Sequence, residues 1–461
     1  MPDNANVDAA QVTGHSDPEI EPDRMSKPLP RKLGPVLATM FVTGNMVGSG
    51  LFLLPATLGT LGGISVFTWG LATIGALVIA GVFARLGVMA PWAGGPYAYA
   101  RATLGRYFGF QTNYIYWISC WVGNVGIALA VTGYLSELFP ALKPPLVSAT
   151  TTSAVIWIMV GANIIGPRIV GGIEAVAMLV GLAPILAIGI FGWFYFDPAI
   201  FAASWNVSGQ PVYLAVPRSL VLVFWAFTGL ESAAVAVEVV DNPQRNLPIA
   251  ALAGVALAAV IYMVSCTVLM GIVPARELAD SSAPFALVAR QIFGPTAATV
   301  LIFTTILKAS GTHGGWTLVS AATAKAAAED GAFPALFAKI DRRGIPVQSL
   351  LAHGVLMTVA AYATASPTIG QQFGKLTDMA VVYSMMAYLY SALSLMDVSK
   401  RKTDQLIAIV AALFSVWVIV ASDSLLLKIA VALAVTSIPL YPFFKGRAET
   451  APVVVGQELE A

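Results

Sequence analysis

The stretch that decides the fold is Gly44-Asn-Met-Val-Gly-Ser-Gly50, which interrupts a segment otherwise apolar enough to cross a bilayer. A spanning helix normally satisfies every backbone N–H and C=O within itself, because hydrocarbon offers no partner. Glycine, Asn and Ser residues at mid-membrane depth weaken that ladder, which is tolerated where the freed groups line a cavity. Helix resumes after Gly50, so its positive dipole end would face a ligand. The sequence therefore predicts a broken helix beside a carboxylate-binding site.

The composition is that of an integral membrane protein. Of its residues 57% are hydrophobic and only 11% are charged, with a mean hydropathy of +0.79, against roughly 25% charged in soluble domains. A net charge of +1 provides no basic face for nucleic acid. The two cysteines, Cys120 and Cys266, exclude a disulfide scaffold or a cysteine metal site. No phosphate loop, HExxH or nucleophile elbow occurs, so we expect no enzyme activity, cofactor or metal.

Apolar runs of about 20 residues, the length that crosses hydrocarbon, predict an all-α polytopic membrane protein with twelve transmembrane helices. Their ranges are 34–58, 62–86, 107–137, 146–166, 172–197, 212–239, 247–273, 296–324, 347–366, 374–397, 404–422 and 424–443. Lys and Arg gather on one side of this arrangement, which places both termini in the cytoplasm. Residues 1–32 are expected to form a disordered tail, 33–443 the transporter domain, and 444–461 a second tail.

A second interruption is expected in the sixth span, at Phe224–Ser232, which holds a Gly, a Thr, two bulky aromatics and a carboxylate. Transporters built from inverted repeats place broken helices at matching positions in both halves. We therefore predict a first repeat at about 33–197, a second at about 211–397, and two extra helices at about 403–443.

Several motifs carry a resemblance to a known family. They are Gly44–Pro55, Gly94–Arg101, Tyr116–Asn124, Phe224–Ser232, Asp241–Pro248, and Gly314–Leu318 followed by Thr323–Pro334. In these the chain resembles the amino acid–polyamine–organocation family of transporters, most closely its bacterial arginine/agmatine antiporters. The resemblance implies a LeuT-like fold with a 5+5 inverted repeat, alternating access, and exchange of arginine for agmatine. It also implies a homodimer in a bacterial inner (plasma) membrane.

The binding site can be argued from residue types. Gly48, Ser49 and Gly50 offer N–H groups and a hydroxyl to a carboxylate, although glycines also serve close helix packing. An indole face at Trp316 can hold a cation, whereas most membrane Trp residues lie in interfacial belts. The predicted substrate-binding residues, including positions taken from the resemblance, are Asn45, Met46, Ser49, Gly50, Ser119, Cys120, Asn124, Trp225, Thr228, Trp316 and Ala380.

Free carbonyls near Met46, Trp225 and Thr228 are expected to accept hydrogen bonds from the substrate α-ammonium. Glu231 is an intramembrane carboxylate, which is costly without a partner; it could tune proton coupling, stabilise a gate with Tyr388, or form a purely structural hydrogen bond across helices. By resemblance, the gating residues are Tyr116, Trp225, Glu231, Trp316 and Tyr388.

Three residues depart from the antiporter pattern: Ala380 stands where the resemblance would place a Ser, and Lys308 and Asp378 are charges within spans. We expect Lys308 and Asp378 to form a structural ion pair; the rival hypothesis is that Lys308 adds charge to the pocket and selects a less cationic substrate. His313 is either a pH sensor or a packed hydrogen-bonding residue.

Three alternative functions remain open. One is a proton- or sodium-coupled amino-acid symporter of the same fold, another is an exchanger for a neutral amino acid or polyamine, and the third is a non-transporting sensor or channel.

Overall fold

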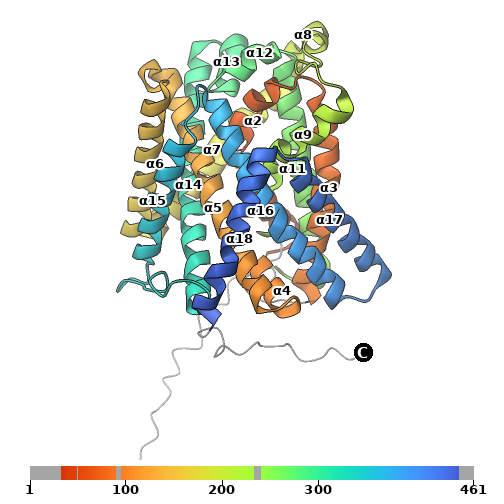
Figure 1. Cartoon of the computed structure of the whole chain (residues 1–461). Coiled ribbons are helices and arrows are strands. Elements are labelled where there is room, and N and C mark those ends of the chain that lie inside the picture. The colour runs from red at the N-terminus through yellow and green to blue at the C-terminus, as the bar shows by residue number, and fades with distance from the viewer. Residues whose placement is uncertain (1–32, 49, 90–94, 233–239, 446–461) are drawn as a thin grey trace, which may run out of the picture.

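The computed structural model describes residues 33–48, 50–89, 95–232 and 240–445, and these form a bundle of helices (Figure 1). Within the described ranges no strand occurs, apart from an isolated bridge between Leu33 and Val240. The predicted all-α class is therefore confirmed. The two predicted tails, 1–32 and most of 444–461, lie outside the described residues.

The helices have the following bounds. They are α1 (Pro35–Met46), α2 (Gly50–Gly59), α3 (Ser65–Met89), α4 (Pro96–Thr103), α5 (Arg106–Leu138), η2 (Pro140–Leu142), α6 (Pro145–Ile165), α7 (Pro167–Phe191), η3 (Gly192–Tyr195), α8 (Pro198–Ala203), α9 (Val212–Phe224), η4 (Trp225–Phe227), α11 (Pro243–Met270), α12 (Ala275–Asp280), α13 (Pro284–Phe293), α14 (Pro295–Glu329), α15 (Val347–Ala363), α16 (Ile369–Val398), α17 (Lys402–Ala421) and α18 (Ser424–Lys445).

Eleven of the twelve predicted spans overlap a helix or a helix pair, and the sixth, 212–239, is described only in its first part, as α9 and η4. By length and composition, seven described helices could cross a membrane, and the bent pair α1 and α2 supplies an eighth. Twelve spans therefore remains a prediction. The last helix, α18, extends two residues past the predicted boundary at 443, to Lys445.

The first predicted helix break is confirmed. Helix α1 ends at Met46, α2 begins at Gly50, and the two axes differ by 51°. At the break the N–H of Gly48 donates to the Met46 carbonyl, 2.7 Å away, and the Tyr262 hydroxyl donates to the same oxygen at 2.6 Å. The Met46 carbonyl is thus satisfied by a local turn and by α11.

The second break lies directly against the first. Helix α9 ends at Phe224 and continues as the single 3-10 turn η4. Gly229 then takes φ +101°, a left-handed conformation that favours glycine. A Cβ at this position would lie 3.0 Å from the Asn45 carbonyl oxygen, so a side chain here would force the two breaks apart. Residues 233–239, which complete the predicted sixth span, lie outside the described residues.

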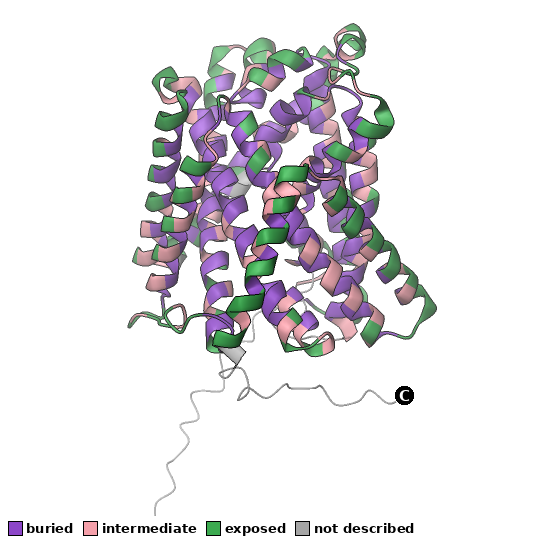
Figure 2. Ribbon diagram, in the orientation of Figure 1, coloured by how far each residue is buried: buried purple, intermediate pink, exposed green. Residues whose placement is uncertain are grey.

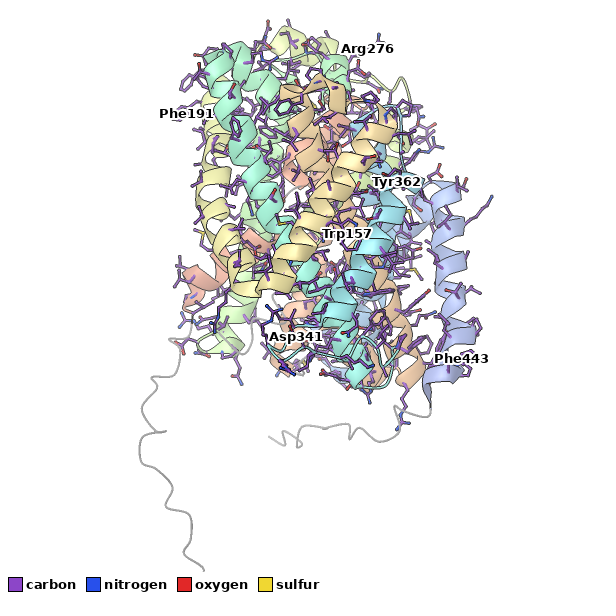
Figure 3. The ribbon with its side chains drawn as sticks, turned by 90° about the vertical axis from the view of Figure 1, so that its left-hand side faces the viewer. Trp157, Phe191, Arg276, Asp341, Tyr362 and Phe443 are labelled. Atoms are coloured by element: carbon purple, nitrogen blue, oxygen red, sulfur yellow. The ribbon has the colours of Figure 1, made fainter. Side chains whose placement is uncertain are left out.

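The centre of the bundle is buried and its outer face is exposed, as Figure 2 shows for the same view. Outer helices expose large apolar side chains, for example Ile158 (63%), Val359 (61%) and Leu413 (65%). Figure 3 shows Trp157 and Tyr362 along the outer side of the bundle, with Arg276 and Asp341 toward its opposite ends. This distribution is that of a protein whose sides face hydrocarbon.

A buried ion pair joins α3 to α17. The Arg85 guanidinium donates to both carboxylate oxygens of Asp404, at 2.9 Å each, and the Ser399 hydroxyl donates to Asp404 at 2.7 Å. The Asp404 side chain is 4% exposed and that of Arg85 is 27% exposed. Because a bidentate pair of this kind is strong and specific, it holds the end of α3 to the start of α17.

We expect Asp404→Ala to destabilise the protein by about 1.5–3 kcal/mol, because it leaves Arg85 without its charged hydrogen-bond acceptor. Thermal unfolding of the purified protein in detergent measures the loss. The control is Glu329→Ala, which removes an exposed ion pair with Lys325 and should change stability little. Equal melting temperatures for the two variants would contradict the anchoring role.

Candidate functional site

A cavity of about 40 Å³ lies where the two helix breaks meet α5, α14 and α16. Its lining combines backbone from the breaks with aromatic and hydroxyl side chains from the long helices. The lining residues are Asn45, Met46, Gly48, Gly50, Tyr116, Ser119, Cys120, Asn124, Ile127, Trp225, Thr228, Glu231, Thr312, Trp316 and Ser384. The cavity can therefore offer an apolar aromatic wall, a few polar groups and one carboxylate to a small molecule.

Most of the predicted binding residues meet at this cavity. Those that line it are Asn45, Met46, Gly50, Ser119, Cys120, Asn124, Trp225, Thr228 and Trp316. Ser49 lies outside the described residues. Ala380 is fully buried and is not among the lining residues; its carbonyl accepts a hydrogen bond from the Ser119 hydroxyl at 2.7 Å. The binding role of all these residues stays a prediction.

Three lining residues were not singled out from the sequence. Thr312 lies four residues before Trp316, Ser384 lies four after Ala380, and Ile127 lies three after Asn124. Residues three or four apart share a helix face. Extending each predicted residue by one turn along its own helix would have found all three.

Glu231 is a buried carboxylate at the cavity that accepts three hydrogen bonds. It accepts hydrogen bonds from the Tyr116 hydroxyl at 2.6 Å, the Tyr388 hydroxyl at 2.5 Å and the Gly229 N–H at 3.0 Å. These donors come from α5, α16 and the second break. The carboxylate, 5% exposed, is thereby compensated for the water it loses. The predicted contact with Tyr388 is confirmed, and gating by this cluster stays a prediction.

The Trp225 indole packs closely against the backbone of α2 at Gly50 and of α5 at Gly123. A Cβ at Gly50 would lie 3.0 Å from its indole, and one at Gly123 would lie 2.6 Å from its Cη2 atom. The indole therefore spans from the start of α2 to the middle of α5 across the cavity. Both positions require a residue without a side chain for the indole to lie as it does.

Two of the carbonyls that we expected to be free are occupied. The Met46 oxygen accepts from Gly48 and Tyr262, and the Trp225 oxygen accepts from the N–H and hydroxyl of Thr228, at 3.2 and 2.7 Å. A carbonyl has two lone pairs. The expectation that both carbonyls would be free is therefore wrong, because each already accepts two hydrogen bonds within the protein.

The side chain of Asn124 belongs to a buried network with α14. Its Nδ2 donates to the Thr317 hydroxyl at 2.8 Å and to the His313 carbonyl at 3.2 Å, and its Oδ1 lies 2.8 Å from His313 Nδ1. His313 is fully buried and is not among the lining residues. The structure therefore shows it as a packed hydrogen-bonding residue.

The predicted ion pair between Lys308 and Asp378 is wrong. Lys308 Nζ instead donates to the Thr312 hydroxyl at 3.1 Å. Within the described chain, the buried Oδ1 of Asp378 has no hydrogen-bond partner. Asp378 lies two residues from Ala380, so it points away from the face of α16 that carries Ala380 and Ser384.

A polar cluster closes the end of the bundle that carries α4. The Tyr97 hydroxyl and the Arg101 guanidinium both donate to Asp330, at 2.8 and 3.0 Å, which ties α4 to the end of α14. Burial, followed by the hydrogen bond to Asp330, raises the pKa of the Tyr97 hydroxyl. The predicted motifs at 94–101 and 323–334 therefore meet in space.

Comparisons with known proteins agree on one family. Residues 33–444 match the family model described as "Amino acid permease". The chain is 36% identical over 406 residues to the putrescine transporter PotE of Escherichia coli (strain K12), which covers 86% of this chain and 92% of the relative. It is also 36% identical over 370 residues to the cadaverine/lysine antiporter of the same strain, covering 79% and 83%.

If Trp225 covers the cavity, a side chain at Gly123 should displace the indole and expose Cys120, because overpacking of this kind costs about 1–3 kcal/mol. We expect Gly123→Ala, on a Cys266→Ser background, to raise the rate of Cys120 alkylation by at least about threefold. The matched control is Gly126→Ala, whose Cβ would make ordinary contacts of 3.6 Å with Phe373. Equal alkylation rates in the two variants would contradict the covering role.

Proposed function

This chain belongs to the amino acid permease family, within the amino acid–polyamine–organocation transporters, and from that premise we propose which substrates it exchanges. It is a transporter of amino acids or polyamines and not an enzyme. Our proposal is exchange of a cationic amino acid that ends in a primary amine for the diamine left by its decarboxylation. Lysine with cadaverine and ornithine with putrescine are such pairs.

The observation that carries this proposal is the engagement of Asn124. Both its donor and its acceptor groups are already bonded to α14. The neighbouring Ser119 hydroxyl is similarly bonded to the Ala380 carbonyl and lies 2.7 Å from the Ser384 hydroxyl. A guanidinium presents five N–H donors in a rigid plane, whereas an ammonium presents three from one point. So few open acceptors favour the compact ammonium.

The opposite end of the substrate is assigned to the first break. Helix α2 begins at Gly50, beside the cavity, and its amino-terminal dipole favours a carboxylate there. Thr228, also at the cavity, remains the candidate for the α-ammonium because the Met46 and Trp225 carbonyls are occupied. The amino acid would thus lie with its head at the break and its tail toward α5 and α16.

Gating is proposed for the two groups that bound this site. Trp225 covers the cavity from the second break, and Glu231 ties that break to Tyr116 and Tyr388. Alternating access requires these contacts to form and separate in turn. We also propose a homodimer in a bacterial inner membrane, as the resemblance implies, and the distribution of basic residues favours cytoplasmic termini.

Trp316 is proposed to hold the cationic tail by cation–π attraction, which contributes up to about 2 kcal/mol when desolvated. We expect Trp316→Leu to weaken binding of the preferred cationic substrate by roughly tenfold, measured by displacement of a radiolabelled substrate. The control is Trp157→Leu, since Trp157 lies on the outer face of α6 and is 38% exposed. Unchanged affinity in Trp316→Leu would remove the residue from recognition.

Exchange is tested by counterflow into proteoliposomes. Labelled lysine or ornithine should enter vesicles preloaded with cadaverine or putrescine and should stay out of empty vesicles. The same assay is run with arginine and agmatine, the pair expected from the resemblance, and with neutral amino acids. Faster exchange of arginine for agmatine would contradict the ammonium preference. Uptake into empty vesicles on a proton gradient would indicate symport, and conductance would indicate a channel.

A further inference from the structure

Lys308 is a buried cation one turn from the cavity wall. It is 3% exposed, and its ammonium donates to the hydroxyl of Thr312, which lines the cavity. The methyl group of Thr312 lies against the first break, since a Cβ at Gly48 would be 3.3 Å from it. Lys308 is therefore linked through one side chain to the segment assigned to the substrate carboxylate.

A carboxylate packs against the same helix as this lysine. The carboxylate belongs to Glu174 of α7. It packs against α14 at Gly311 and Gly315: a Cβ at Gly315 would lie 2.6 Å from a Glu174 carboxylate oxygen. Residues 308, 311 and 315 share one face of α14. Glu174 therefore approaches from the α7 side, while Thr312 stands between Lys308 and the cavity.

The ammonium of Lys308 lies beside the cavity wall, because it donates to the hydroxyl of Thr312. The stem of Lys308 packs against α7, where a Cβ at Gly181 would lie 2.3 Å from the Lys308 Cβ, so the ammonium sets up a positive field at the cavity. In a site shielded from water such a field acts strongly over several ångströms. It favours an anionic group at the cavity and disfavours a second cationic one.

We propose that Lys308, acting through Thr312, is a specificity-determining residue that favours the carboxylate-bearing amino acid over its diamine. The inference rests on the proposed exchange of these two substrates. The amino acid places an anionic carboxylate at the break, whereas the diamine lacks this group and carries a second ammonium. The field of Lys308 therefore separates the affinities of two molecules that share the same tail.

The measurement is the ratio of the dissociation constants of cadaverine and lysine, determined for purified protein by calorimetry. Lys308→Met should lower this ratio by at least about fivefold, because lysine loses a favourable interaction and cadaverine loses an unfavourable one. Glu174→Gln should raise it, because the lysine charge is no longer balanced. Lys308→Arg, which keeps the charge, should restore part of the ratio.

The two variants are expected to change the ratio of dissociation constants in opposite directions, which distinguishes a role in specificity from a purely structural role. A purely structural pair predicts that Lys308→Met and Glu174→Gln weaken both ligands together, and such a result would overturn the inference. Thr312→Val, which is nearly isosteric, should also lower the ratio. It is the variant to use if Lys308→Met does not fold. The matched control is Lys375→Met, which removes a lysine of α16 that donates to the Ser366 hydroxyl and should leave the ratio unchanged.

Failure of the proposed function gives a different result. Wild-type protein that binds neither the lysine pair nor the ornithine pair would refute the exchange proposal, and this inference would fall with it. Wild-type protein that binds both members of a pair, with a ratio unaffected by Lys308→Met, would refute this inference alone.

Discussion

The acceptance of three hydrogen bonds by Glu231 is the constraint on which the site depends. A carboxylate inside a membrane protein is stable only when its oxygens are matched by donors. Here the donors are Tyr116, Tyr388 and the Gly229 N–H, so three separate segments must converge on one side chain. That convergence brings the second break against α5 and α16. The same geometry seats Gly229 on the Asn45 carbonyl, and the cavity forms where the two breaks touch.

Two backbone carbonyls at the helix breaks are already bonded within the protein. Local turns and the Tyr262 hydroxyl satisfy the Met46 carbonyl, and Thr228 satisfies that of Trp225. Because each of these carbonyls accepts two hydrogen bonds, neither is open to a ligand. Affinity for a small cationic substrate must then come from aromatic faces, from the start of α2 and from the surrounding field. Such a site discriminates by charge placement more than by the number of hydrogen bonds.

The sequence carried enough information for the breaks and for most of the cavity. A run of glycines with Asn and Ser in an apolar segment weakens the helix at mid-membrane depth, so the break before Gly50 could be predicted without a structure. The partners of the buried charged residues could not be predicted from the sequence. Lys308 and Asp378 lie on different helices whose rotation the sequence does not specify, and their predicted pairing was wrong. Glu174 was overlooked, although a lone carboxylate in an apolar span is itself a signal.

The central claim is that the substrate lies between the first break and Trp316, with its carboxylate at the start of α2. An experimental structure of the protein with bound lysine tests this most directly. We expect the carboxylate beside Gly50 and the aliphatic chain along the Trp316 indole, with the ammonium directed toward Ser119. Lysine bound in the reverse orientation, or at a site outside this cavity, would contradict the account.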